Sequence, residues 1–326
     1  MEEILQTLDT DGRLEGVPFM PEMLRFCGQE FRVRARAHKV CDTIDWQQFR
    51  RMDNAVHLAD LRCDGSAHGD CQAGCLLFWK EAWLRPVAPQ HNEGSDPPNV
   101  VKAHDGSSND AEVTVETLSQ ATQVGTNDAG HTLFSCQATE VSRATKGPVN
   151  WWEPRQYVED LTSRNSTIKR VVRALLVGLF NRFQKATARF LPRFCLIQGG
   201  KRYPFIKGTA APGQTPGAAL GLQSGEIVEI KSKEEIFATL DSADITGRLR
   251  FDSEMLKYCG RRARVLRRIE RIIDEKTGRM LRIKQDCVIL EGVVCTGDYH
   301  RSCPRAIYPY WREAWLKRVD ETTGTS

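Results

Sequence analysis

An internal repeat constrains this chain more than any other feature. Residues 2–87 match residues 234–319 at a constant offset of 232 without a gap, and 29 of these 86 positions are identical. The identities include Cys63 with Cys295, His68 with His300, Cys71 with Cys303, Trp79 with Trp311 and Trp83 with Trp315. The chain therefore carries two copies of one module, called here the first and the second repeat. Two copies are too few for a solenoid, which stacks three or more.

The pattern within each repeat predicts strands more than helices. Residues 31–38 alternate apolar and basic side chains, which is the period of a half-buried strand. A second strand is expected within residues 280–290, and each repeat ends in Trp-x-x-x-Trp-Leu, whose tryptophans we expect to anchor a core. We predict an α+β, β-rich fold with two homologous small barrel-like modules of SH3-like type. An acidic linker and a basic amphipathic helix would join them.

One strand differs between the repeats. Residues 225–232 read as a strand directly before the second repeat, whereas Met1 stands beside the start of the first. We expect that the first repeat either lacks this edge strand or receives it from another segment. Residues 112–116 alternate and are the candidate.

Composition divides the chain into five regions. Residues 88–130 contain no aromatic residue, one leucine, seven acids and one lysine, which is a linker composition. The predicted boundaries are 1–88 for the first module with its Cys/His cluster, 89–147 for an acidic flexible linker, 148–200 for a basic amphipathic helical segment, 201–224 for a Gly/Pro-rich connector and 225–320 for the second module.

The middle of the chain carries a basic amphipathic pattern. Between Leu161 and Gly225 there are eleven Lys or Arg and no acid, and apolar residues recur at helical spacing. We expect a helix over about residues 166–192 that buries Val172, Leu175, Leu179 and Phe183 on one side. Two alternatives remain open for residues 168–193, namely a membrane surface or an acidic partner such as nucleic acid.

A cysteine-rich loop in the first repeat points to a metal. Cys63, His68, Cys71 and Cys75 lie within 13 residues, with Gly65, Gly69 and Gly74 between them, and Cys41 lies upstream. Thiolates and imidazoles gathered in one short loop can surround a single ion. We predict a zinc site formed by Cys41, Cys63, Cys71 and Cys75, with His68 as a substitute ligand or a group beside the site.

The second repeat refines this prediction. It keeps Cys295, His300 and Cys303, but Ile273 replaces Cys41 and Ile307 replaces Cys75. Loss of both cysteines to the same apolar residue suggests that positions 41 and 75 are neighbours. The second repeat would then be degenerate, or would bind through Cys295, His300, Cys303 and one of Cys259 or Cys287. A rival set for the first repeat is Cys27, Cys63, His68 and Cys71.

The string Cys63-Asp-Gly-Ser-Ala-His68 resembles the signature of the CDGSH iron–sulfur family. The histidine here follows the cysteine by five residues instead of four, and the Cys-x-Cys pair of that family is missing upstream. The resemblance covers six residues and implies an iron–sulfur cluster as the alternative cofactor to zinc.

The remaining features narrow the class of protein. No apolar run reaches the roughly 20 residues of a membrane span, and the first 25 residues lack a signal-peptide pattern. The net charge of +4 is too small to indicate a particular class of binding partner. There is no P-loop, dinucleotide fingerprint or nucleophile elbow, and the sequence leaves open whether the chain is an enzyme.

We therefore expect a cytoplasmic tandem-module protein with a structural zinc ion in the first module, acting in binding or assembly with a protein partner. One alternative is an iron–sulfur enzyme or electron-transfer component. The other is a nucleic-acid-binding protein that uses the basic helix and the strand face of Arg32, Arg34, Arg36 and His38.

Overall fold

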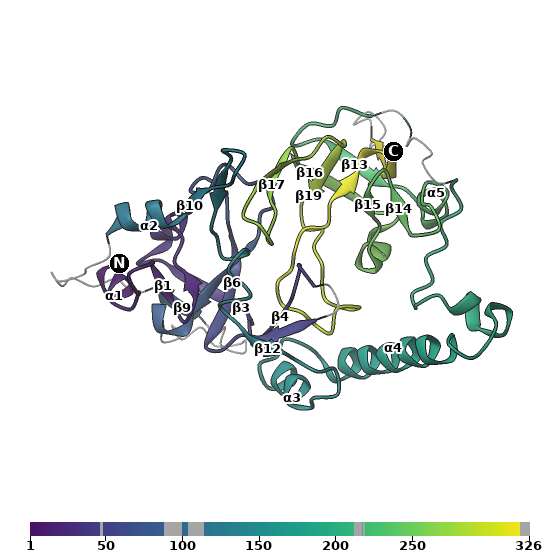
Figure 1. Cartoon of the computed structure of the whole chain (residues 1–326), viewed down its shortest axis with the longest axis horizontal. Coiled ribbons are helices and arrows are strands. Elements are labelled where there is room, and N and C mark those ends of the chain that lie inside the picture. Colours follow the sequence, from purple (N-terminus) through teal and green to yellow (C-terminus); the bar gives the residue numbers. More distant parts are fainter. Residues whose placement is uncertain (46–47, 88–99, 104–113, 212–216, 218, 320–326) are drawn as a thin grey trace, which may run out of the picture. The chain divides into compact units, whose positions relative to one another are not determined.

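The computed structural model describes residues 1–45, 48–87, 100–103, 114–211, 217 and 219–319 (Figure 1). It combines helices with several small antiparallel sheets, and none of the sheets among the described residues closes into a barrel. The mixed architecture is confirmed, whereas a repeated barrel is not.

The chain divides into two compact units. The first comprises Met1–Ser166, Arg271–Arg282 and Cys303–Ile307, and the second comprises Thr167–Glu270, Ile283–Ser302 and Tyr308–Ser326. Two short segments of the second repeat thus belong to the first unit.

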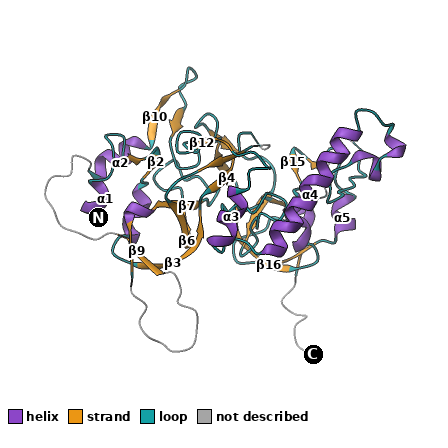
Figure 2. Ribbon diagram, turned by 90° about the horizontal axis from the view of Figure 1, so that it is seen from below, coloured by secondary structure: helices purple, strands orange, loops and turns teal. Residues whose placement is uncertain are grey.

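Each unit contains one five-stranded antiparallel sheet. The sheet of the first unit has the order β7 (Leu76–Lys80), β6 (Ala55–Arg62), β3 (Glu30–Arg36), β9 (Val100–Ala103) and β8 (Leu84–Pro86). Figure 2 labels the first four of these strands. The sheet of the second unit has the order β20 (Trp311–Arg312), β19 (Cys287–Leu290), β16 (Arg262–Arg268), β13 (Ile227–Ile230) and β21 (Leu316–Arg318).

The two sheets follow the repeat residue by residue. Val33 pairs with Leu58 and Ala35 with His57, and the register shifts between the two pairs. Val265 pairs with Leu290 and Arg267 with Ile289, with the same shift. All four positions are related by the offset of 232, so both repeats form the same strand pairing with the same bulge.

The first repeat does receive its missing strand from another segment, but not from the predicted one. β9 pairs with β3 through Phe31 and Val101 and takes the place that β13 has in the second sheet. The candidate at residues 112–116 is wrong where the structure describes it, because Val115 begins helix α2 (Val115–Ala121). Residues 112–113 lie outside the described residues. Pairing by β9 satisfies the backbone groups along one edge of β3.

The expected tryptophan anchors are confirmed. Trp79, Trp83, Trp311 and Trp315 are fully buried. Phe19 meets the Trp83 ring edge to face at 5.1 Å, and Phe251 meets the Trp315 ring in the same way at 5.3 Å. The Trp83 indole N–H donates to the Thr7 hydroxyl at 3.0 Å, and Trp315 makes the equivalent bond to Thr239. Both cores therefore contain the same hydrogen bond between a buried tryptophan and a threonine.

Smaller elements complete the units. In the first unit these are α1 (Glu2–Leu5), β1 (Arg13–Leu14), β2 (Val17–Pro18), the 3₁₀ helix η1 (Pro21–Phe26), β4 (Lys39–Cys41), β5 (Phe49–Arg51), η2 (Glu81–Trp83), β10 (Gln123–Thr126), β11 (Thr132–Phe134), β12 (Lys146–Pro148), α3 (Arg155–Thr162), β17 (Arg271–Ile273) and β18 (Met280–Arg282). In the second they are α4 (Ile168–Thr187), η3 (Arg193–Cys195), η4 (Ile197–Gly200), α5 (Lys233–Phe237), β14 (Ile245–Thr246), β15 (Leu249–Arg250), η5 (Ser253–Tyr258) and η6 (Glu313–Trp315).

The expectation of a flexible linker over residues 89–147 is wrong for the part that the structure describes. Leu118, Cys136, Ala138 and Val141 join the core of the first unit. The buried Gln137 side chain donates to the Phe78 and Pro18 carbonyls and accepts from the Phe78 backbone N–H. The described part of this stretch has few apolar residues, but those few are buried in the core. The Gln137 side chain bonds both backbone groups of Phe78 on β7, as a neighbouring strand would.

Within the first unit, hairpins and cysteine loops from the two repeats exchange partners. The Cys41 backbone N–H donates to the Cys303 sulfur at 3.3 Å, and the Ile273 N–H donates to the Cys71 sulfur at 3.4 Å. These four positions are two pairs of repeat equivalents. The equivalent residues Thr43 and Glu275 contact each other.

The basic helix is present as α4, and its N-cap Thr167 accepts from the Arg170 N–H. The predicted burial of its apolar stripe is wrong, because Val172, Leu179 and Phe183 are about half exposed and Leu175 is only partly buried. The side that packs inward instead includes Val171 and Gln184. No helix among the described residues is long and apolar enough to cross a bilayer.

A buried histidine makes stability depend on pH. Burial lowers the pKa of His57 from 6.5 to about 3, against a hydrogen bond between its Nδ1 and the Leu77 carbonyl. Below pH 6.5 His57 binds a proton in the unfolded chain but not in the folded chain. Acidification therefore lowers the free energy of unfolding by up to about 1.4 kcal/mol per pH unit.

The second repeat has Ile289, also fully buried, at the position of His57. We expect His57→Ile to fold and to flatten the fall in urea-unfolding free energy between pH 6.5 and pH 4. An unchanged slope would contradict this role of His57.

Candidate metal centre

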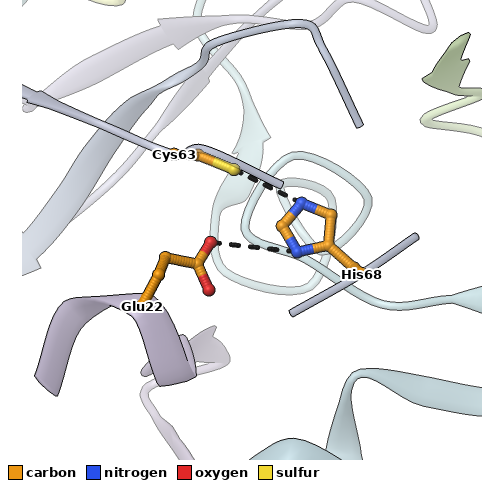
Figure 3. Close-up of side chains that lie close together, drawn as sticks. All are labelled: Glu22, Cys63 and His68. Carbon is orange, nitrogen blue, oxygen red and sulfur yellow. Dashed lines mark hydrogen bonds and ion pairs between the residues drawn. The ribbon is translucent and has the colours of Figure 1, made fainter. Parts of the chain in front are cut away.

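Three buried side chains of the first repeat converge on one point (Figure 3). Glu22 projects from η1, Cys63 directly follows β6, and His68 lies in the loop after it. The Cys63 N–H donates to the Cys75 carbonyl and closes this loop at its base. η1 begins at Pro21, a residue suited to the first helical position.

The loop takes its shape from Gly65. The N–H groups of His68 and Asp70 both donate to the Gly65 carbonyl. Gly65 has a φ of +80°, and a Cβ at this position would overlap the backbone of Cys71. Only glycine fits such a close approach in this conformation. Gly297 has a φ of +76° and accepts from the N–H groups of His300 and Ser302, so the second repeat builds the same turn.

The first triad consists of Glu22, Cys63 and His68. The Cys63 sulfur lies 3.3 Å from His68 Nε2, and His68 Nδ1 lies 3.8 Å from a Glu22 carboxylate oxygen. One potential ligand atom from each residue lies within 4.8 Å of the other two. Both Glu22 oxygens and His68 Nδ1 are buried, and they form no hydrogen bond with any residue that the structure describes. Buried polar atoms without partners are rare and call for an explanation such as an ion.

Burial shapes the electrostatics of the first triad. It raises the pKa of the Glu22 carboxyl above 4.5, raises the pKa of the Cys63 thiol well above 9.0, and lowers the pKa of His68 to about 4. Each of these shifts is in the direction of the neutral form, because burial penalises the charged form. A buried thiol of this kind is a poor nucleophile, because the thiolate is the reactive form.

A cavity of about 30 Å³ adjoins the first triad. Its lining includes Cys63 and His68 together with Cys71, Cys75 and Cys136. A cavity of this volume is large enough to hold a water molecule or a single ion. The cavity therefore brings four thiols and an imidazole to one place.

The second repeat contains the equivalent triad, Glu254, Cys295 and His300. Its polar atoms have partners within the protein. Glu254 accepts from the Thr296 and Tyr299 backbone N–H groups. His300 lies 3.5 Å from Cys295 through Nδ1 and 3.5 Å from Asp252 through Nε2.

Asp252 accounts for the difference between the two histidines. Against desolvation, its hydrogen bond and that of Cys295 raise the pKa of His300 to about 11. The first repeat has Met20 at the position of Asp252, which gives His68 no such partner.

The structure distributes the predicted ligands as follows. Cys63 and His68 belong to the first triad, and Cys295 and His300 to the second. Cys71 and Cys75 line the cavity. Cys41 packs with Cys303, Phe49 and Val149 in a separate cluster, although Cys41 and Cys75 both lie near the buried guanidinium of Arg305. In the rival set, Cys27 lies 4.0 Å from the Met23 carbonyl and does not line the cavity.

Glu22, Glu254 and Cys136 are not among the ligands predicted from the sequence. Glu22-Met-Leu and Glu254-Met-Leu are identical blocks of the repeat, so the glutamate shared by both copies could have indicated a ligand. Cys136 carries no comparable signal, because it lies outside both repeats. Models of known protein families, curated proteins and solved structures give no match to this chain.

Proposed function

We propose that this chain is a metal-binding protein whose first repeat holds a structural Zn²⁺ ion through Glu22, Cys63 and His68. The observation that carries the proposal is the set of buried Glu22 and His68 atoms without hydrogen-bond partners beside the Cys63 sulfur. A bound cation would offset the cost of burying the carboxylate and the thiolate.

The donor set favours zinc over an iron–sulfur cluster. One sulfur, one nitrogen and one carboxylate oxygen are all ligands that zinc accepts, whereas iron–sulfur clusters are held chiefly by four thiolates. Zinc in structural sites takes four ligands. Cys71, Cys75 and Cys136 line the adjoining cavity and are the candidates for the fourth.

We assign the metal to the first repeat and not to the second. The Glu254 carboxylate and the His300 ring already have partners in Thr296, Tyr299 and Asp252. A cation would have to displace these contacts, so the second triad is stable without one.

The ion would join two segments that are far apart along the chain, namely η1, which carries Glu22, and the loop after β6, which carries Cys63 and His68. We propose that it stabilises a cytoplasmic scaffold of two related units that serves in binding or assembly. Reduced thiols in that compartment remain available for metal binding.

Elemental analysis of the full-length chain after dialysis against zinc tests the assignment. We expect a single tightly bound zinc ion in the wild type and in Cys295→Ser, and its loss in Cys63→Ser. Cobalt in place of zinc should give a thiolate-to-cobalt charge-transfer band that disappears in the same variant. Equal zinc content in the two variants would contradict the assignment, and a brown protein containing iron and sulfide would favour the iron–sulfur alternative.

A further inference from the structure

Helix α4 presents an apolar stripe to solvent along its length. Ile168, Val172, Leu176, Leu179 and Phe183 are between 48% and 69% exposed. Their spacing of four, four, three and four residues places them on one face of the helix. A helix of 20 residues is about 30 Å long, so the stripe is a continuous feature and not an isolated side chain. Two further large side chains beyond the helix, Phe190 and Phe194, are more than four-fifths exposed.

The opposite side of α4 is attached to its own unit. Arg170 forms an ion pair with Asp298 at 2.9 Å. The buried Gln184 side chain donates to the carbonyls of Ile197 and Lys201, and Phe180 meets the Phe205 ring at 6.1 Å. These contacts fix one side of α4, the helix labelled in Figures 1 and 2. The exposed stripe therefore belongs to an anchored helix with an outward face.

Basic residues border the stripe on both sides. At 100° per residue, Lys169 and Arg173 fall on one flank and Arg182 on the other, and Arg173 also donates to the Tyr299 hydroxyl at 3.1 Å. From residue 161 to residue 225 the chain contains eleven Lys or Arg and no acid. The face thus combines an apolar centre with a positive border.

We propose that this face of α4 lies in the headgroup region of an anionic membrane surface, with the stripe inserted and the basic border on the lipid phosphates. The pattern of Leu and Phe on one face with Lys and Arg beside it suits such a surface. A second copy of this chain would bring two positive borders together. A nucleic acid would contact the basic side chains but would leave Ile168, Leu176 and Leu179 exposed to water.

Co-sedimentation of the full-length protein with vesicles tests the proposal. We expect binding to phosphatidylcholine vesicles that contain phosphatidylserine, weaker binding to phosphatidylcholine alone, and release by added salt. The triple variant Leu176→Gln/Leu179→Gln/Phe183→Gln should bind at least about tenfold more weakly. Glutamine keeps a helix propensity close to that of leucine, so α4 should stay formed, which circular dichroism checks. Val124→Gln, an exposed apolar residue on β10, is the matched control and should bind as the wild type does.

Three results would overturn the proposal. The first is no sedimentation with phosphatidylserine vesicles at low salt, and the second is undiminished binding by the triple variant. The third is a wild-type dimer that becomes monomeric in the triple variant without any vesicle binding, which would assign the face to a second copy. Binding to duplex DNA or RNA that persists in the triple variant, in the absence of vesicle binding, would assign the basic residues to nucleic acid.

Discussion

Zinc added to the metal-free full-length chain should raise its unfolding temperature, and His68→Ala should abolish the increase. A ligand at 1,000 times its dissociation constant stabilises a folded state by about 4 kcal/mol. For a unit of this size that corresponds to a shift on the order of 10 °C. The effect should be this large because the three ligands are buried and because Glu22 comes from a different segment than Cys63 and His68. The unfolded chain offers no equivalent site.

Differential scanning calorimetry with zinc or with a chelator measures this shift. The matched control is His300→Ala, which removes the equivalent ring of the second repeat and should leave the zinc-dependent increase intact. Comparing each variant with and without zinc separates metal binding from the cost of deleting a buried ring. A shift that survives in His68→Ala, or one that is lost in His300→Ala, would contradict a site in the first repeat.

Replacing Asp160 should destabilise the first unit by about 3–5 kcal/mol, because it would leave a buried lysine without its counter-charge. Lys39 Nζ lies 2.6 Å from an Asp160 oxygen, and both side chains are about 1% exposed. The other Asp160 oxygen lies 3.1 Å from His38 Nε2. Asp160 thus joins α3 to β4 through two partners.

Urea unfolding of Asp160→Asn measures this loss. The double variant Lys39→Met/Asp160→Asn should recover most of the stability, since replacing both members of a buried pair costs far less than replacing one. Arg155→Ala, which removes an exposed ion pair on the same helix, should change little. If the double variant were no more stable than the single one, the loss would come from packing and not from the unpaired charge.

Local patterns predicted several elements of this protein. The ungapped repeat predicted two equivalent structures, and the two sheets share strand order and register. Trp-x-x-x-Trp-Leu predicted buried anchors, and the alternating residues 31–38 predicted β3. Candidate ligands Cys63 and His68 lie five residues apart, so one glycine-shaped turn brings them together. Each of these features depends on residues close in the sequence or on comparison of the two copies.

Contacts between distant segments could not be predicted in the same way. β9 pairs with β3 across about seventy residues, Glu22 reaches Cys63 from another element, and Cys136 reaches the cavity from outside the repeat. Cys41 meets Cys303 instead of joining Cys63, because hairpins and loops of the two repeats exchange partners.

The sequence by itself determined that the chain contains two copies of one module, a thiol-rich turn and a basic amphipathic helix. Periodicity and spacing are properties of neighbouring residues, so they can be read without coordinates. Only the tertiary structure decided which buried groups lack partners and which face of α4 meets water. Burial and pairing depend on the whole surroundings of a side chain. Asp252 pairs with His300, whereas Met20 gives His68 no equivalent partner, and the contacts of Arg170 and Gln184 hold the opposite side of α4 against its own unit.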